Sequence, residues 1–232
     1  QVTLTASQNT VSFKNTNYSD TNKAYNEVVG NIRGAIVTLS SDDANATNSV
    51  GSTLTLDNNR ITIGKGVKVS SSSIAGAYVE SDVDSGGATI HASYNTVKVE
   101  GEVTATETDH TISAVRTESG LVTANNNKLI INGKVTGDTG TEIRAVNVAE
   151  QKTIGTVLTK VTHDLRNNSV EIGATADISN ASIAAAVSNN NNALTLNNDV
   201  TVAGKVTNSD IYGGTGADSL VDVQAGSLLT YN

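Results

Sequence analysis

Apolar and polar residues alternate with a period of two in short runs that recur along this chain, and each run opens with an asparagine. If that asparagine is position zero, apolar residues stand at +2 and +4 in five copies. The asparagines are Asn59, Asn95, Asn127, Asn168 and Asn198, and the apolar pairs are Ile61/Ile63, Val97/Val99, Leu129/Ile131, Val170/Ile172 and Val200/Val202. Such alternation of β-branched residues predicts strands with one apolar face. NTVSF at Asn9 is a degenerate earlier copy.

A second pattern follows each run after 13 to 17 residues: an isoleucine, then small or β-branched residues. These isoleucines are Ile74, Ile112, Ile143, Ile183 and Ile211, and Ile32 also fits. The copies recur every 30 to 41 residues, which is the range of solenoid repeats. The alanine-rich stretch 181–188 is compatible with a helix by composition, but its register with the other copies predicts a strand.

The repeat predicts an all-β fold, a single parallel β-helix of about six coils with two or three short strands per coil. We expect one domain over residues 1–232. Residues 1–50 would form a degenerate N-terminal coil region, residues 51–214 the regular coils, and residues 215–232 a last coil that continues or caps the solenoid. The rival is a β-sandwich or hairpin array, which would need tight two-residue turns that the sequence lacks.

The recurring asparagines and glycines have a structural explanation. Stacked asparagine amides one strand spacing apart can hydrogen-bond to one another, and asparagine tolerates a left-handed backbone. The predicted ladder is Asn59, Asn95, Asn127, Asn168 and Asn198. Glycine at +6 (Gly101, Gly133 and Gly204) indicates a bend with positive φ or with close packing.

Composition narrows the function. The 232 residues carry a formal charge of −8, which argues against nucleic acid as a partner. The chain has no Cys, so disulfides and thiol chemistry are excluded. No apolar run approaches the ~18 residues of a membrane helix, so we expect no membrane insertion by this chain. Nothing predicts a cofactor. Because the chain opens with Gln1 rather than Met, we expect a mature or excised piece.

The pattern N-x-V-x-I-x-G-x-V, followed by I-x-G-A or IYGG, resembles the passenger repeats of bacterial autotransporter adhesins. The resemblance covers about residues 58–214. It implies a right-handed β-helix displayed at the bacterial cell surface or secreted, of which this chain would be a passenger fragment.

Two segments are candidates for cation binding. GGTGADSLV, residues 213–221, fits a calcium-binding nonapeptide, with Asp218 as the carboxylate and Leu220 as the inward apolar residue. The next nine residues lack the matching glycines and aspartate, so no metal site is predicted and Asp218 is only a calcium candidate. The acids near SDVDSGG lack EF-hand spacing, which favours a solvated loop.

Catalysis by a β-helix would need acids, bases or arginines clustered across neighbouring coils. Arg116 and Arg144 follow the second pattern in adjacent copies, but at different offsets, so we expect them not to stack. The histidines 91, 110 and 163 are isolated in sequence. The sequence therefore favours a protein that is not an enzyme.

The preferred function is a surface adhesin or stalk that binds a glycan or protein receptor on host or bacterial surfaces. The alternatives are a subunit of an extracellular fibre that assembles end to end, and a glycan-active enzyme. Strand residues are committed to stacking, so binding is expected in the insertions 38–52, 80–93 and 147–166. Within residues 80–93 the candidate binding residues are Glu80, Asp82, Asp84 and His91.

Overall fold

The computed structural model describes residues 2–39, 51–81, 88–108, 110–118, 120–138, 140–148, 162–188, 193–214 and 219–230. In these residues all regular secondary structure is β-strand, and the strands form four parallel sheets of six or seven strands each. We name the sheets A to D in the order in which the chain visits them. The all-β parallel β-helix predicted from the repeat is confirmed.

Sheet A contains β1 (Thr3–Thr5), β5 (Thr53–Thr55), β9 (Thr89–His91), β13 (Leu121–Thr123), β17 (His163–Arg166) and β21 (Ala193–Leu196). Sheet B contains β2 (Thr10–Phe13), β6 (Arg60–Ile63), β10 (Thr96–Val99), β14 (Lys128–Ile131), β18 (Ser169–Ile172), β22 (Asn198–Val202) and β25 (Ser219–Val223).

Sheet C contains β3 (Asn26–Val29), β7 (Val67–Ser71), β11 (Glu102–Ala105), β15 (Lys134–Thr136), β19 (Asp177–Ser179), β23 (Lys205–Thr207) and β26 (Leu228–Thr230). Sheet D contains β4 (Ile32–Leu39), β8 (Ser73–Ser81), β12 (Thr111–Thr117), β16 (Glu142–Val148), β20 (Ser182–Ser188) and β24 (Asp210–Gly214).

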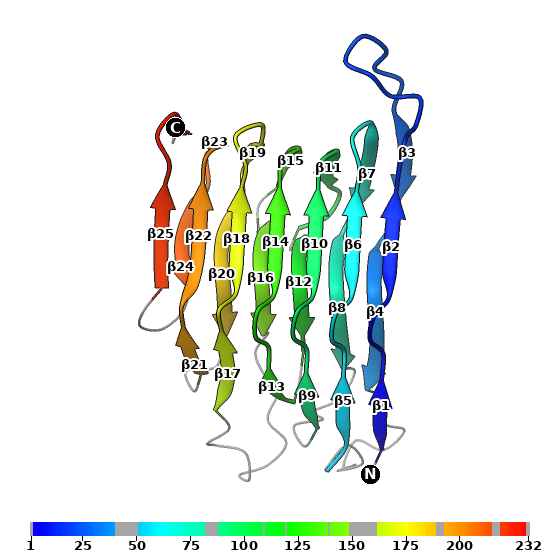
Figure 1. Ribbon diagram of the computed structural model, residues 1–232, viewed down its shortest axis with the longest axis vertical. Coiled ribbons are helices and arrows are strands. Elements are labelled where there is room, and N and C mark those ends of the chain that lie inside the picture. Colours follow the sequence, from blue (N-terminus) through cyan, green and yellow to red (C-terminus); the bar gives the residue numbers. More distant parts are fainter. Residues whose placement is uncertain are drawn as a thin grey trace.

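Each coil passes through sheets A, B, C and D once, and each strand pairs with the equivalent strand of the next coil (Figure 1). Among the described strands this makes six coils of four strands, and β25 and β26 add a seventh strand to sheets B and C. The expected number of coils is confirmed, but two or three strands per coil is too few. Sheets A and C were underestimated because most of their strands have only three residues, too few for alternation to be recognised.

The solenoid has two layers, with sheets A and B in front of sheets C and D in Figure 1. One apolar cluster lies between sheets B and C and the first part of sheet D, and a second lies between sheet A and the last part of sheet D. Sheet D changes cluster in mid-strand: Ala114 packs in the first and Val115 in the second. Each of these strands therefore has two consecutive inward residues at the point where it bends. The core remains narrow enough to be filled by aliphatic residues.

The apolar pairs of the repeat form the inward rows of sheet B, as predicted. Val97, for example, pairs with Ile61 on one side and Leu129 on the other, and its exposed fraction is 0%. The isoleucines of the second pattern stack in the same way in sheet D, where Ile112 pairs with Ile74 and Ile143. The alanine-rich stretch forms β20, so the strand prediction is correct there too.

The asparagines at the junction of sheets A and B form a hydrogen-bonded ladder through the core. The Nδ2 of Asn95 donates to the Oδ1 of Asn127 at 3.1 Å, and the backbone N of Asn95 donates to the same oxygen at 2.9 Å. The same pair of bonds joins Asn59 to Asn95, Asn127 to Asn168 and Asn168 to Asn198. The ladder starts at Asn9, whose Nδ2 donates to Asn59 at 2.8 Å.

The left-handed backbone falls on the residue before each ladder asparagine. Asn126 has a φ of 59°, and Tyr94 occupies the equivalent position with a φ of 60°. One residue therefore provides the left-handed turn, and the next residue provides the inward side chain. The +6 glycines need close packing rather than positive φ: a Cβ on Gly133 would stand 1.9 Å from the carbonyl oxygen of Gly101.

Candidate functional site

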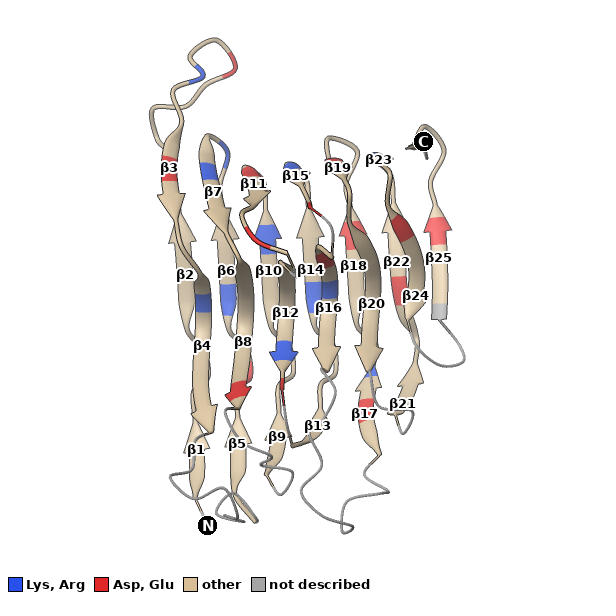
Figure 2. Cartoon of the chain, turned by 180° about the vertical axis from the view of Figure 1, so that it is seen from behind, with Lys and Arg blue, Asp and Glu red and all other residues tan. Residues whose placement is uncertain are grey.

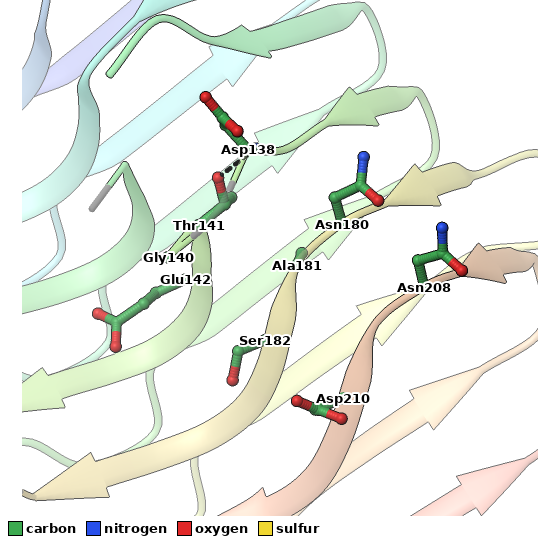
Figure 3. A pocket seen from close by; sticks show the side chains of 9 residues that line it. All are labelled: Asp138, Gly140, Thr141, Glu142, Asn180, Ala181, Ser182, Asn208 and Asp210. Carbon is green, nitrogen blue, oxygen red and sulfur yellow. Dashed lines mark hydrogen bonds between the residues drawn. The ribbon is translucent and has the colours of Figure 1, made fainter. Parts of the chain in front are cut away.

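A cleft among the described residues lies where sheet C turns into sheet D, and we call it the corner groove (Figure 3). Its volume is about 510 Å³, and it spans three consecutive coils, from β15–β16 to β23–β24. The lining residues are Asp138, Gly140, Thr141, Glu142, Asn180, Ala181, Ser182, Asn208 and Asp210. Nearly every side chain in this set carries a carboxylate, hydroxyl or amide, so the groove offers hydrogen bonds rather than an apolar surface.

The repeat arranges these groups in two rows along the solenoid axis. Glu142, Ser182 and Asp210 are register partners in sheet D, so they recur at one strand spacing, about 4.8 Å. Asn180 and Asn208 form the second row. Both have a left-handed backbone conformation, with φ angles of 56° and 47°. Figure 3 shows the two rows side by side across the coils. Groups repeated at such a spacing suit a linear ligand that lies along the axis.

A compact turn closes one end of the corner groove. The hydroxyl of Thr141 accepts a hydrogen bond from the backbone N of Asp138 at 2.9 Å, and the N of Thr141 donates back to the Asp138 carbonyl at 3.0 Å. Gly137 donates to the carbonyl of Ser179 in the next coil at 2.8 Å, which ties the turn to the neighbouring corner. The wall of the groove is therefore held in place by backbone contacts.

Arg144 supports the groove from beneath. Although it is charged, its exposed fraction is only 2%. Its Nη2 donates to the hydroxyls of Ser182 and Tyr212, both at 2.9 Å, and lies 3.6 Å from the Oε1 of Glu142. The Nδ2 of Asn147 donates to the other oxygen of Glu142 at 2.6 Å. Two groove side chains, Glu142 and Ser182, are thus oriented before any ligand arrives.

The corner groove carries carboxylates at its surface and the positive charge of Arg144 beneath it. Burial lowers the pKa of Arg144, opposed by the nearby Tyr212 and Glu142, but a guanidinium stays charged at neutral pH. Asp138 and Glu142 contribute carboxylates from one coil, and Asp210 contributes one from the second coil after it. The part of the chain that the structure describes contains no group of three or more His, Cys, Asp or Glu that could hold a metal ion. The lining chemistry fits neutral or amine-bearing hydroxylated ligands better than anionic ones.

The candidate residues of the insertion 80–93 do not form a recognisable site in the described part. Glu80 is at the end of β8 in sheet D, where its Oε2 accepts a hydrogen bond from the hydroxyl of Thr38 at 3.2 Å. His91 ends β9 in sheet A and is half-buried. Asp82 and Asp84 lie outside the described residues.

The calcium candidate Asp218 also lies outside the described residues. The orientation expected for its neighbour Leu220 is wrong, because Leu220 pairs with the outward residue Asp199 and is 58% exposed. The inward row of sheet B continues through Val221, the partner of Val200. The register of the repeat, rather than the nonapeptide pattern, determines which residue faces inward.

The residues considered for catalysis are not gathered in one place. Arg116 pairs with Tyr78 and Asn147, and Arg144 with Ser113 and Ala184, so the two arginines do not stack, as expected. His110 and His163 are buried, and burial lowers the pKa of both, to about 4 for His110. His110 contacts the hydroxyl of Ser71 at 3.1 Å, and the Nδ1 of His163 accepts a hydrogen bond from the N of Val122. Both histidines belong to the core.

The corner groove was not found from the sequence, although a signal for it exists. The residue before the isoleucine of the second pattern is polar in every copy: Asn31, Ser73, Thr111, Glu142, Ser182 and Asp210. A polar residue that recurs in register at a corner predicts a row of hydrogen-bonding groups, although Ser73 and Thr111 of this row are buried. What the sequence does not show is that the hydrogen-bonded residues Asp138 and Thr141 close this row at one end.

Searches of protein-family models, of curated proteins and of solved structures find no match to this chain. In the described residues, no helix is long and apolar enough to span a membrane. The site therefore has to be interpreted from its own geometry.

Proposed function

We propose that this β-helix is a non-enzymatic scaffold of the bacterial cell surface or extracellular space, of the autotransporter-passenger type, which adheres to glycans through its corner groove. The observation that carries the proposal is the double row of hydroxyl, amide and carboxylate groups that repeats with the coils. A glycan chain presents hydroxyls at regular intervals along its length. A row of donors and acceptors at regular intervals can therefore bind several successive sugar residues.

Two further features support a binding role. Arg144 and Asn147 hold Glu142 in place, so the groove loses little side-chain entropy when a ligand binds. The inward residues are fully used in the core and the asparagine ladder, so the outer surface is the part of the solenoid that is free to vary.

The test is binding of the intact chain to an immobilised panel of neutral and amine-bearing oligosaccharides. Replacing Glu142 with Gln together with Asp210 with Asn should weaken binding by about tenfold, because two acceptors of the ligand's hydroxyls or amines are lost. Asp199→Asn, an outward change in sheet B, is the matched control and should leave binding unchanged. Equal binding by the double variant and the native chain would refute glycan binding through the corner groove.

The same incubation tests whether the protein is an enzyme. A non-enzymatic scaffold leaves the oligosaccharide chain length unchanged in mass spectrometry. Shorter products that disappear in the Glu142→Gln variant would replace this proposal with the glycan-active alternative, in which the acids of the groove act on the glycosidic bond.

Binding through the insertion at residues 80–93 stays a prediction. Replacement of residues 82–87 by a short Gly-Ser linker should leave the thermal unfolding unchanged and should weaken cell binding if this insertion contacts the receptor. Unchanged cell binding would remove Asp82 and Asp84 from the interface.

A second candidate function is a fibre subunit that associates end to end. Its support is the apolar surface at the last described coil, where Val223, Leu228 and Leu229 are about half-exposed. Charge also differs along the axis: on the strands, blue residues prevail in the earlier coils and red ones in the last coils (Figure 2). Light scattering over a concentration series separates the two functions. Growing length supports the fibre, and a constant monomer mass supports the scaffold.

A further inference from the structure

We propose a second ligand site, at the edge where sheet B turns into sheet C, and infer that it binds a saccharide residue bearing a carboxylate. We call this hollow the tip groove; its volume is about 220 Å³. The aromatic and charged residues that line it are Tyr18, Asp20, Tyr25, Lys65, Glu100, Glu102 and Lys134. The site is on a different edge from the corner groove and does not depend on it.

Two tyrosines stand at the end of the tip groove that is nearer the N-terminus. Tyr18 and Tyr25 belong to the segment between β2 and β3, which extends beyond the other turns at the top of Figure 1. Their ring centroids are 5.3 Å apart at an interplanar angle of 54°. Both rings are half-buried, so each retains an accessible part. Aromatic rings provide a flat apolar surface of the kind on which the C–H face of a sugar ring packs.

The tyrosines are held by specific backbone contacts. The Nδ2 of Asn15 donates to the carbonyl oxygens of Ala24, at 2.7 Å, and Gly66, at 2.9 Å, which closes the base of the segment onto the next coil. The ring of Tyr18 lies directly on Gly66, where a Cβ would come within 2.3 Å of the tyrosine side chain. Because Gly66 has no side chain, the ring of Tyr18 can pack into the groove.

Tyr25 is fixed by its polar neighbours. The Nζ of Lys68 lies 4.0 Å from its ring centroid, a cation–π contact. Hydrogen bonds with Glu102 and, to a lesser degree, Tyr18 raise the pKa of Tyr25, so its phenol stays protonated and donates.

Among the described residues, the charged groups of the groove that have no ion-pair partner are two lysines and the exposed carboxylate of Asp20. Glu100 is paired with Lys98 at 2.7 Å and Glu102 with Lys68 at 3.8 Å. Lys65 and Lys134 also line the groove, and neither has an ion-pair partner among the residues that the structure describes. Both are exposed. The groove thus combines an aromatic surface with two available ammonium groups, which together match a sugar ring and its carboxylate.

The floor of the tip groove follows from the repeat. Gly101 and Gly133 have to lack side chains because their coils approach so closely. Asn132 and Thr175 line the same hollow, and the hydroxyl of Thr175 donates to the carbonyl of Asn132 at 2.7 Å. The half-buried amide side chain of Asn132 is available there for the hydroxyls of a ligand.

The experiment is calorimetric titration of the intact chain with a tetramer of galacturonic acid, with a tetramer of galactose as the neutral probe. We expect the acidic tetramer to bind at least about tenfold more tightly, and its affinity to fall as salt is raised. Lys65→Gln combined with Lys134→Gln should remove most of that preference, and Tyr18→Ala should weaken both tetramers. Equal affinity for the two tetramers in the native chain would overturn the proposal.

Two controls distinguish this site from the rest of the surface. Lys205→Gln changes a lysine on the same edge that is already near Asp177, at 3.5 Å, and should retain the native affinity. The Glu142→Gln and Asp210→Asn variant of the corner groove should also retain it. Loss of acidic-tetramer binding in either control would locate binding elsewhere, and unfolding curves identify any variant that has lost its fold. Failure at the tip groove leaves the proposed function of the corner groove untouched.

Discussion

Asn126 and Asn127 illustrate how neighbouring residues of the same type are used for different reasons. Asn126 has a φ of 59°, a left-handed conformation that glycine adopts freely and asparagine tolerates better than most other residues. Asn127 is fully buried, and its Nδ2 donates to the Oδ1 of Asn168 and the carbonyl of Ala92. At position 126 the backbone is what matters, and at position 127 the side chain.

Glycine substitution separates the two roles. Asn126→Gly should change the free energy of unfolding by no more than about 0.5 kcal/mol, because glycine accepts the left-handed backbone. Asn127→Gly should cost about 3 kcal/mol, because the buried N and Nδ2 of Asn95 lose their acceptor and the carbonyl of Ala92 loses a donor. Urea unfolding of both variants measures the difference. Similar losses at the two positions would mean that the ladder contributes no more than the turn.

Buried histidine makes stability depend on pH. Burial holds the pKa of His110 at about 4 in the folded chain, whereas the unfolded value is about 6.5. Between these values the unfolded state binds more protons, so stability is complete above pH ~6.5 and falls as the pH drops towards 4. The loss from His110 amounts to about 3 kcal/mol.

The measurement is urea unfolding between pH 7 and pH 4. His110→Asn should flatten this part of the profile, while His91→Asn, at a half-exposed strand end, should preserve it. If the profile of the His110→Asn variant parallels that of the native chain, His110 is not responsible for the pH dependence.

At the scale of elements, the sequence predicted best where four residues alternate after an asparagine. The strands β6, β10 and β14 were foreseen because the inward rows are aliphatic and the outward ones polar. The strands of sheet D were predicted from their isoleucines, but their burial on both faces was not predicted. Arg144, for example, is a charged residue, yet Ser182 and Tyr212 of the next two coils cover it. Contacts between coils decide such burial, and one coil's sequence does not reveal it.

The grooves escaped prediction for the same reason. Each contains residues from three or more coils, and neighbouring coils become neighbours only when the register is fixed. The predicted binding residues were three acids and a histidine in an insertion (Glu80, Asp82, Asp84 and His91), because insertions are less constrained than strands. The structure instead draws attention to the corners, where every coil presents one polar residue to the same row.

Close packing of glycines gives a prediction at this scale. Gly133→Ala should cost about 3 kcal/mol, because the new Cβ would meet the carbonyl of Gly101 at 1.9 Å and the coils would have to separate. Gly226→Ala has no atom within 4 Å of its Cβ but a φ of +91°, so backbone strain alone should cost about 1 kcal/mol. Thermal unfolding of the two variants checks the order. A smaller loss at Gly133 than at Gly226 would mean that the coils can adjust their spacing.

At the scale of the whole molecule, the solenoid is a stack whose interior is nearly the same in every coil. The inward rows and the asparagine ladder run through it from the first coil to the last, so recognition is confined to the outside. Because the side-chain period of a strand is two, a shift of one residue would turn every inward row outward. Both proposed grooves depend on this register, since it determines which polar residues reach the surface.

The most direct test of the register is a comparison of two neighbouring substitutions in β10 by equilibrium unfolding. Val97→Asp would bury a carboxylate between Ile61 and Leu129, and we predict a loss of about 4 kcal/mol or more. Thr96→Asp places the same group on the outer face, between Arg60 and Lys128, and should change stability by about 0.5 kcal/mol or less. If Thr96→Asp proves as damaging as Val97→Asp, the register is wrong, and with it the inward rows and both grooves.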